Sequence, residues 1–362
     1  MMTTMRKKMG TLLLLTALLC GPQRAFACDE GQDDRSWPCS LEVRGSSVTL
    51  VGASFVWQAS AWYVRTQGRS LSPMKHLAPQ LYFAKLGQSP LSFEPQGMVV
   101  SERRGPASWS PPAGFYKPDE PYIPWRAKER NGTAYLVTYR NGEHIYDFTG
   151  LPIALTFLRS DDGLTWNPVA GSGVVESGGG SETDFELGAG GDLYAVTRNE
   201  PGDSTGWGSK LCHASAAALA SWSCVHDPKK YDSPLTFTHA GRIYLIARRN
   251  LTGSGDYELT GGLPWSAQET LKNLADYSAT PKRCSLWRLE RGGPALGLVL
   301  DLPGWGDTCF PALLKDAADP DLLSVYNYSS PQICKHFVPL RAADRLSLRL
   351  AQWLPFPRRT HP

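Results

Sequence analysis

The sequence predicts an all-β protein, a single β-propeller made of four-stranded antiparallel blades. One observation is composition: the 362 residues include 35 Gly and 28 Pro beside 12 Trp, 14 Tyr and 12 Phe, and aromatic segments divided by turn residues are typical of short strands. A second is an internal repeat, in which two strands joined by a glycine-bearing turn recur every 50–75 residues. Further strands follow each copy, and four antiparallel strands per repeat is the pattern of a propeller blade.

The repeat is clearest in two segments in the middle of the chain. Glu182 stands 16 residues before Arg198, and Asp232 stands 16 residues before Arg248. In both segments a Gly three residues before a Tyr marks the turn between two strands. Each copy therefore begins with an acidic residue on the first strand of a blade. Looser copies begin near two further acids, Glu120 and Asp307.

The third and fourth strands of a blade are expected in the residues that follow each copy. Examples are 154–160 with 164–169, and 209–215 with 221–226. An irregular unit with strands at 47–58, 62–65 and 81–93 supplies a first blade, and 346–353 is expected to close the ring with an early strand. The count is five blades, or six if residues 40–118 contain more than one.

The repeats are expected to form one domain, because no Pro/Ser-rich linker interrupts them. We assign residues 1–27 to a secretory signal peptide, 28–39 to an N-terminal segment, 40–357 to the propeller and 358–362 to a tail. A sandwich or two stacked β domains is the alternative architecture.

The first 27 residues have the pattern of a secretory signal. Basic residues at 6–8 precede an apolar run at 12–19, and Ala-Phe-Ala at 25–27 forms a cleavage site. The apolar run is far shorter than the roughly 20 residues of a membrane span; a buried N-terminal helix is the alternative. This segment carries four basic residues and no acid, so without it the formal net charge falls from +3 to −1. We therefore expect a secreted or periplasmic monomer that binds no nucleic acid.

Seven cysteines remain after the signal segment, and their spacing favours disulfides. No C-x-x-C or H-E-x-x-H pattern occurs, so no metal site is predicted, and export makes disulfides the default. Close spacing pairs Cys212 with Cys224, and Cys28 with Cys39. The sequence leaves open which of the other three is unpaired: Cys284, Cys309 or Cys334.

Residues Ser160–Trp166 read S-D-D-G-L-T-W and resemble the Asp-box pattern S-x-D-x-G-x-T-W, with one residue fewer between the Asp and the Gly. In such a turn Ser and Asp accept hydrogen bonds from amides, Gly takes a positive φ and Trp packs between strands, so its role is structural. With the Glu-x-Asp…Gly-x-Leu-Tyr…Arg segment at 182–198, the motif makes residues 119–330 resemble the sialidase (neuraminidase-like, BNR-repeat) superfamily. A weaker similarity, to five-bladed arabinanase-type glycosidases, lies in the acidic residues on inner strands. Both resemblances imply a propeller that acts on carbohydrate.

Two sialidase positions differ in this sequence. The R-I-P element, which places an arginine against the substrate carboxylate, corresponds here to Tyr122-Ile-Pro, and the strand that carries the nucleophilic tyrosine corresponds to 308–311, where Phe310 has no hydroxyl. Asp147 lies about where the family keeps its acid/base Asp. Without the arginine, the charge-assisted pair with the substrate carboxylate is lost. Without the tyrosine nucleophile, the route through a covalent intermediate is lost. The resemblance therefore does not imply sialic acid hydrolysis by the usual mechanism.

The acidic residues that begin the repeats are the candidate catalytic groups. Equivalent positions of successive blades surround one axis, and paired carboxylates there can protonate a leaving oxygen and activate water or attack a sugar. We predict Glu182 and Asp232 as this pair. Arg198 and Arg248 are predicted either to bind a carboxylate or sulfate of an acidic sugar or to hold the carboxylates ionised. Alternative carboxylates are Asp147, Glu120 and Asp307, and the aromatic residues predicted to contact substrate are Tyr122, Trp125 and Tyr328.

The sequence thus predicts an exported glycoside hydrolase that acts on an extracellular glycan with no cofactor. The alternative is a propeller that binds a glycan or a protein without catalysis. A purely structural role for the Asp–Arg pairs, which can hold inner strands together, is the third interpretation of the same residues.

Overall fold

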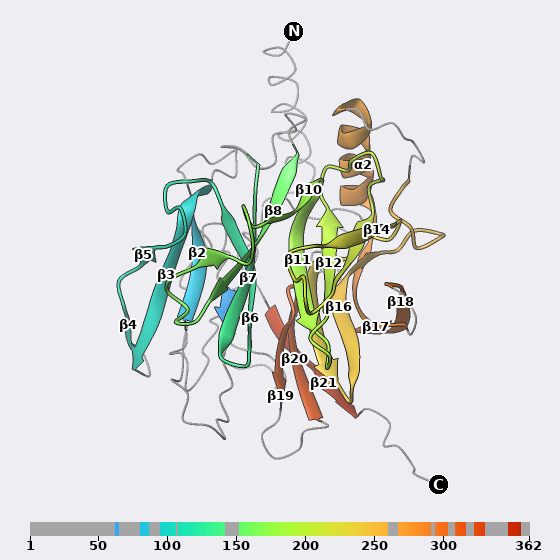
Figure 1. Cartoon of the computed structure of the whole chain (residues 1–362). Helices are drawn as coiled ribbons and strands as arrows, with labels where there is room; N and C mark the ends of the chain where they lie inside the picture. The colour runs from blue at the N-terminus through green and yellow to red at the C-terminus, as the bar shows by residue number, and fades with distance from the viewer. Residues whose placement is uncertain are drawn as a thin grey trace, which may run out of the picture.

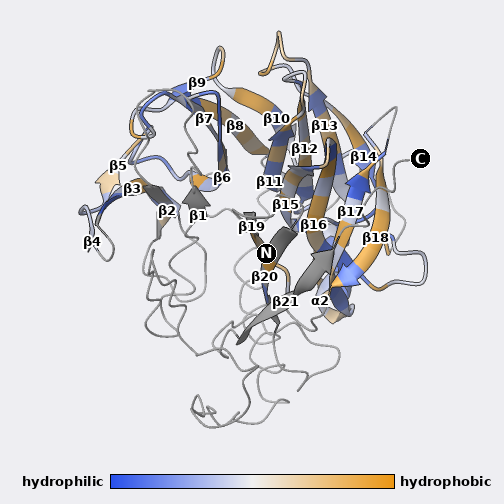
Figure 2. Cartoon of the chain, turned by 90° about the horizontal axis from the view of Figure 1, so that it is seen from below, coloured by the Kyte–Doolittle hydropathy of each residue, from blue (hydrophilic) through white to orange (hydrophobic). Residues whose placement is uncertain are grey.

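The computed structural model describes residues 62–64, 80–86, 95–105, 108–141, 152–259, 267–290, 294–302, 308–315, 322–329 and 347–355. These residues form five antiparallel sheets that follow one another along the chain (Figure 1). Seen from below, the sheets stand side by side around a common centre (Figure 2). This arrangement confirms the predicted class, an all-β propeller of antiparallel sheets, while the number of blades stays a prediction.

The strands of each sheet are close neighbours in sequence. The first sheet contains β1 (Trp62–Val64), β2 (Gln80–Leu86), β3 (Pro95–Gly105), β4 (Ser108–Trp109) and β5 (Ala113–Gly114). The second contains β6 (Ile123–Arg130), β7 (Thr133–Arg140), β8 (Ile153–Ser160), β9 (Asn167–Pro168) and β10 (Val174–Gly178). The third contains β11 (Gly180–Leu187), β12 (Leu193–Asn199), β13 (Ser209–Ala214) and β14 (Ser223–Asp227).

The fourth sheet contains β15 (Asp232–His239), β16 (Arg242–Asn250), β17 (Lys282–Leu289) and β18 (Leu296–Leu302), and the fifth contains β19 (Ala312–Lys315), β20 (Leu322–Ser329) and β21 (Ser347–Pro355). Helix α2 (Ala267–Ala279), which the sequence did not predict, is inserted between β16 and β17. The segment expected to close the ring, 346–353, falls in β21, which pairs with β20 in the described part of the chain instead of with an early strand.

In the second and fourth sheets, tight two-residue turns join the first two strands. Asn131 and Gly132 connect β6 to β7 with φ of 54° and 84°, and Ala240 and Gly241 connect β15 to β16 with φ of 47° and 69°. Two consecutive residues with positive φ define a type I′ hairpin, whose twist matches that of the strands it joins. Gly132 and Gly241 are therefore a consequence of the turn geometry.

The hydrophobic core lies between neighbouring sheets. Phe157 of the second sheet meets Phe185 of the third edge-to-face, with ring centroids 5.1 Å apart, and Leu245 of the fourth sheet packs in one cluster with Val196 of the third. Strand β11 is buried along most of its length because sheets flank it on both sides. Polar side chains on such a strand must find partners within the protein.

The turn between β8 and β9 is fixed by side chains of the Ser160–Trp166 segment. Ser160 Oγ accepts the Gly163 amide at 2.8 Å, and Asp162 Oδ1 accepts the amides of Leu164 at 2.7 Å and Thr165 at 2.6 Å. The buried Trp166 donates its Nε1 hydrogen to the Gly163 carbonyl at 3.0 Å. These bonds lock the turn and seat the indole against the first sheet.

Two disulfides lie in the described residues. Cys212 on β13 is bonded to Cys224 on β14, which confirms the predicted local pair. Cys284 on β17 is bonded to Cys309, a pairing that the sequence left open. Residues 1–61, with the predicted signal peptide, the 28–39 segment and the Cys28–Cys39 pair, lie outside the described residues, as do the tail at 358–362 and Cys334.

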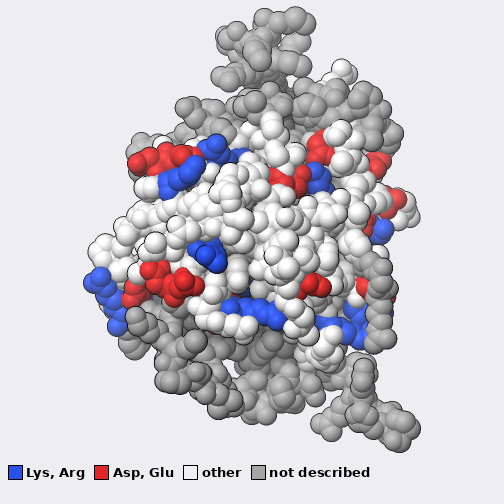
Figure 3. All heavy atoms as spheres, viewed as in Figure 1, with Lys and Arg blue, Asp and Glu red and all other residues white. Residues whose placement is uncertain are grey.

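The charge distribution agrees with the near-neutral composition. On the face drawn in Figure 3, the lysines and arginines of the described residues are interspersed with aspartates and glutamates. In the described part of the chain no helix is long and apolar enough to cross a membrane. The same residues contain no group of three or more His, Cys, Asp or Glu side chains arranged to hold a metal ion.

Candidate functional site

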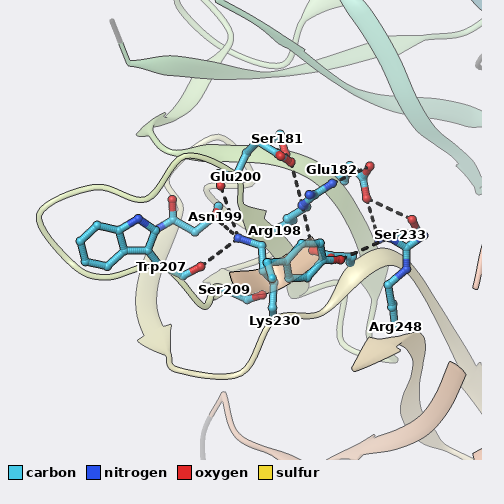
Figure 4. A network of polar contacts seen from close by, with 12 residues as sticks. Ser181, Glu182, Arg198, Asn199, Glu200, Trp207, Ser209, Lys230, Ser233 and Arg248 are labelled. Atoms are coloured by element: carbon cyan, nitrogen blue, oxygen red, sulfur yellow. Dashed lines mark hydrogen bonds and ion pairs between the residues drawn. The ribbon is translucent and has the colours of Figure 1, made fainter. Parts of the chain in front are cut away.

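One guanidinium connects the two predicted catalytic carboxylates. Glu182 lies on β11 and Arg198 on β12 of the third sheet, whereas Asp232 begins β15 of the fourth. Arg198 Nη1 lies 3.2 Å from Glu182 Oε1, and its Nε lies 2.8 Å from Asp232 Oδ1. Because β11 packs beside β15, residues from two repeats meet at this point (Figure 4).

A bulge at the start of β15 completes the contact between the two sheets. The strand register shifts between Asp232 and Leu235, and Ser233 adopts a φ of 50°, which is uncommon for a residue other than glycine. In this conformation the Ser233 amide donates to Glu182 Oε2 at 2.7 Å, and its hydroxyl donates to the same oxygen at 3.1 Å. Backbone strain of this kind clusters at functional sites.

A third carboxylate, Glu200, joins the pair from the residue after β12. Its Oε2 lies 2.7 Å from Arg198 Nε and accepts a hydrogen bond from the Ser181 hydroxyl at 3.3 Å. Burial raises the pKa of Glu200, although the neighbouring Arg198 and Lys230 cations oppose the shift. Burial therefore favours the protonated form of Glu200.

A second cation, Lys230, is buried beside this group. Its Nζ donates to the carbonyl oxygens of Asn199 at 2.6 Å and Trp207 at 3.0 Å, and it lies 4.2 Å from the centre of the Tyr257 ring. Burial lowers the pKa of Lys230 to about 8, despite the opposing attraction of the Asp232 carboxylate. Lys230 adds positive charge beneath the three acids and fixes the loop that follows Glu200.

Helix α2 contributes a tyrosine to the same site. The Tyr277 hydroxyl donates to Asp232 Oδ2 and accepts a hydrogen bond from Arg248 Nη1 at 3.2 Å. The Arg198 guanidinium lies 5.6 Å from the centre of the Tyr277 ring. We call Glu182, Arg198, Glu200, Asp232 and Tyr277 the Arg198 cluster.

Every carboxylate oxygen of the predicted pair is engaged in the Arg198 cluster. Glu182 is held by Arg198 and Ser233, and Asp232 is held by Arg198 and Tyr277. Both side chains are nearly inaccessible to solvent, with exposed fractions of 5% for Glu182 and 0% for Asp232. These partners fix the position and orientation of both carboxyl groups.

The spacing of the pair suits carbohydrate chemistry. Because both carboxylates contact one planar guanidinium, their nearest oxygens lie less than about 9 Å apart. The carboxyl groups of glycosidases stand roughly 5–10 Å apart, depending on whether a water must fit between them. The upper bound on the separation of Glu182 and Asp232 is thus compatible with that range.

The predicted substrate-binding arginines have partners within the protein. Arg198 contacts three carboxylates. Arg248 donates its Nε hydrogen to the Thr308 carbonyl at 2.8 Å and its Nη1 hydrogen to Tyr277. Asp232 lies directly opposite Arg248 in the strand register, yet it pairs with Arg198 of the preceding sheet. Of the two predicted roles, the contacts match the one in which arginine holds carboxylates in place.

A second group of ion pairs, centred on Asp184, joins strands β6, β11 and β15. Asp184 on β11 is fully buried, lies 3.0 Å from Lys128 Nζ and 3.4 Å from Arg126 Nε, and accepts the Thr236 amide at 2.7 Å. Lys128 also bonds to the Thr236 carbonyl at 2.7 Å. These contacts join β6, β11 and β15, so pairing of acid and base across sheets is a general device for holding the inner strands of this molecule.

Other predicted site residues lie apart from the Arg198 cluster. Glu120 forms ion pairs with Arg140 and, at 3.1 Å, with Lys117. Tyr122 is buried, with its ring 5.1 Å from the Arg140 guanidinium, so the contacts of Glu120 and Tyr122 are with this local group. Asp147 and Asp307 lie outside the described residues, and Tyr328 lies in β20 with its side chain likewise outside them.

Trp125 does not present its ring to solvent, as stacking on a sugar would require. It is 2% exposed and packs between Tyr139, 5.9 Å away, and Phe310, 6.3 Å away, measured between ring centroids. The exposed ring at this position is that of Phe310, with 42% of the residue accessible. The exposed aromatic ring in this region is therefore that of Phe310. The sequence identified this residue only because it replaces the nucleophilic tyrosine of sialidases.

Sequence reasoning missed four residues of the site, and a signal exists for two of them. Side chains two residues apart on a strand point to the same side. Glu200 and Lys230 stand two residues from Arg198 and Asp232, just beyond the ends of β12 and β15, so continuing the alternation past the strand ends would have indicated them. Ser233 and Tyr277 have no such signal, because one depends on a bulge and the other on an inserted helix.

Comparison with known proteins gives a distant likeness. No protein-family profile matches the chain, and no curated protein matches it at a significant level. Among solved structures, the chain is similar to an endo-arabinase from Bacteroides thetaiotaomicron VPI-5482, with 12% identity over 83% of this chain and 95% of that chain and a TM-score of 0.46. A protein of unknown function from Dyadobacter fermentans DSM 18053 is 14% identical over 76% of this chain and 72% of that chain, with a TM-score of 0.46.

A sialidase from Trypanosoma rangeli, solved in complex with sialic acid, is 13% identical over 77% of this chain and 43% of that chain, with a TM-score of 0.45. Because these TM-scores are below 0.5, the likenesses stand as similarities only. The fold is established by the pairing of the strands.

Proposed function

We propose that this protein is an exported glycoside hydrolase in which the Arg198 cluster is the catalytic centre. The observation that carries the proposal is the bridge from Arg198 to Glu182 and Asp232, which brings carboxylates of two successive repeats to one point between the sheets. Hydrolysis of a glycosidic bond requires two carboxyl groups at such a separation and no organic cofactor.

The environments of the three acids assign them different roles. Glu200, whose pKa burial raises, supplies the proton to the leaving oxygen, because a general acid must remain protonated nearer to neutral pH. Glu182, which is held in place by its bonds to Arg198 and Ser233, activates water or attacks the sugar. Asp232 is the more deeply buried member of the pair and stabilises the positive charge that develops on the sugar ring.

Isosteric substitutions test this assignment. The purified protein is assayed against labelled oligosaccharides that include neutral, uronic-acid and sulfated sugars, beside Glu182→Gln and Asp232→Asn. Glu186→Gln is the matched control, since Glu186 lies on the same strand but pairs with Lys128 at 3.1 Å. We expect Glu182→Gln and Asp232→Asn to lower the rate at least about 100-fold without unfolding the protein, and Glu186→Gln to leave it within a fewfold. Unchanged hydrolysis in both cluster variants would contradict the site.

A second candidate function is glycan binding without catalysis. The observation that favours it is the complete engagement of the Glu182 and Asp232 oxygens by groups of the protein, which matches an inner-strand brace as well as a catalytic pair. Retention of an oligosaccharide by the wild type without any cleavage, and equal retention by Glu182→Gln, would establish this function in place of hydrolysis.

A further inference from the structure

Phe310 is an exposed aromatic residue in a segment that is otherwise buried. It is 42% exposed, whereas Thr308 and Cys309 before it are fully buried. The segment directly precedes β19 of the fifth sheet, and Phe310 contacts Trp125 of the second sheet and Arg248 of the fourth. Three sheets therefore meet at this one ring.

The backbone that carries Phe310 is held in place by several independent contacts. Cys309 has a φ of 78°, is bonded to Cys284 on β17 and donates its amide hydrogen to Asn327 Oδ1 at 3.1 Å. The Thr308 carbonyl accepts a hydrogen bond from Arg248 Nε at 2.8 Å. The exposed ring is thus held on a fixed support, which lowers the entropy lost when a ligand packs against it.

Phe310 is also connected to the Arg198 cluster. The Arg248 guanidinium lies 5.8 Å from the centre of the Phe310 ring, and the same guanidinium donates to the Tyr277 hydroxyl at 3.2 Å, which in turn donates to Asp232. Arg248 and Tyr277 therefore connect the exposed ring to the Asp232 carboxylate of the cluster. A ligand that packs on Phe310 would reach toward polar groups at its edge.

This combination fits a sugar ring better than a protein surface. One face of a sugar presents C–H groups, which suit the electron-rich face of an aromatic ring, and its edge presents hydroxyls for polar neighbours. A protein partner would favour a wider apolar patch. The other exposed large apolar residues of the described chain are spread over strands β10, β14 and β18, helix α2 and loops, Leu298 and Val299 on β18 among them.

We propose that Phe310 is a stacking platform for one sugar ring of the glycan, beside the Arg198 cluster. This inference rests on the proposed function, because it requires a carbohydrate ligand. It assigns to Phe310 a role that needs no hydroxyl: the residue contributes affinity and orientation through its ring face.

The test compares substitutions of Phe310 with a control of equal exposure. An array of neutral, uronic-acid and sulfated oligosaccharides identifies the best-bound probe, and Kd values for that probe are measured for wild type, Phe310→Ala, Phe310→Trp and Leu164→Ala. Leu164 is also 42% exposed but lies in the turn between β8 and β9. Thermal melts establish that each variant is folded.

We expect Phe310→Ala to weaken binding about tenfold or more, the order of loss when a stacking ring is removed. Phe310→Trp should bind within about threefold of wild type, with its added fluorescence quenched or shifted by the sugar, and Leu164→Ala should bind as wild type does. The fluorescence signal keeps the test decisive if Phe310→Ala fails to fold.

The outcomes separate this inference from the proposed function. If Phe310→Ala binds the probe with wild-type affinity, the stacking platform is overturned and the proposed function stands. If Phe310→Ala misfolds, the same conclusion follows from a Phe310→Trp variant that binds the sugar without any change in its fluorescence. Absence of any bound oligosaccharide on the array, with no hydrolysis, would overturn both.

Discussion

Asp232 pairs with Arg198 of the preceding sheet, at 2.8 Å between Oδ1 and Nε, although its partner in the strand register of its own sheet is Arg248. The repeat offset of 16 residues between acid and arginine therefore does not describe one ion pair per blade. Arg198 instead serves acids of two repeats, and Arg248 turns toward Tyr277 and Thr308. Neighbouring sheets are tied together through charges at the inner ends of their strands.

Replacing Arg198 should destabilise the protein strongly. The variant Arg198→Met leaves Glu182, Glu200 and Asp232 buried with a single nearby lysine, and removing one partner of a buried ion pair costs about 3–5 kcal/mol. The exposed pair of Arg288 and Glu290, at 3.4 Å, provides a control, for which Arg288→Met should cost less than about 1 kcal/mol. Urea denaturation measures the free energy of unfolding of both variants. Similar decreases in Arg198→Met and Arg288→Met would show that the Arg198 cluster is not a buried charge network.

Tyr277→Phe should lower stability by about 1–3 kcal/mol, because Asp232 Oδ2 loses its hydroxyl donor and Arg248 loses an acceptor within a buried site. The ring itself remains, so packing against Tyr257 is preserved. Tyr194→Phe is the control, since the Tyr194 hydroxyl makes no hydrogen bond with the described residues while its ring lies 5.0 Å from His213. Equal melting temperatures for Tyr277→Phe and the wild type would contradict the hydrogen bonds assigned to the hydroxyl.

Glu200→Gln should change the pH dependence of stability in a defined direction. Burial raises the pKa of Glu200 above its ordinary value of 4.5, so the folded chain holds this proton more tightly than the unfolded chain. Its contribution to stability is fully present below pH 4.5 and is lost as pH rises through the folded pKa. Gln cannot ionise, so the free energy of unfolding of Glu200→Gln relative to wild type should increase as pH rises through this window.

Denaturation curves recorded in steps from pH 4 upward check the Glu200 prediction. Glu290→Gln, at a largely exposed position, should show no comparable trend. A difference between Glu200→Gln and wild type that stays constant or falls with pH would contradict a raised pKa.

Asp162→Ala should destabilise the β8–β9 turn by about 1 kcal/mol, because the amides of Leu164 and Thr165 lose their acceptor. Asp161→Ala is the adjacent control, as Asp161 accepts one long bond from the Thr133 hydroxyl at 3.3 Å, and it should change stability by less than about 0.5 kcal/mol. Equal melting temperatures for Asp162→Ala and Asp161→Ala would show that the two aspartates contribute equally, and would contradict the role assigned to Asp162 in the turn.

The contribution of Asp162 should also depend on pH. Burial opposes its ionisation, but hydrogen bonds from Thr165, Leu164 and Ser160 outweigh that effect and lower the pKa of Asp162 from 3.8 to about 2. The stabilisation is present above pH 3.8 and is lost as pH falls through about 2. Wild type and Asp162→Ala should therefore converge in melting temperature as the pH is lowered across this range.

The sequence by itself determined the fold class and the first two strands of each repeat, because these depend on local chemistry. Gly132 and Gly241 mark hairpins whose positive φ values few other residues adopt, and the Asp162 turn is closed by side chains within seven residues. The Cys212–Cys224 disulfide was predictable for the same reason, since the two residues lie opposite each other on adjacent strands.

Only the tertiary structure decided which charges meet. Asp232 reaches Arg198 because two sheets pack their inner strands together, and Ser233 reaches Glu182 because a bulge turns its amide toward the neighbouring strand. Tyr277 arrives from an inserted helix that no repeat predicts. The exposure of Phe310 and the burial of Trp125 likewise depend on how three sheets meet. Contacts between residues distant in sequence are set by packing, and local spacing does not encode them.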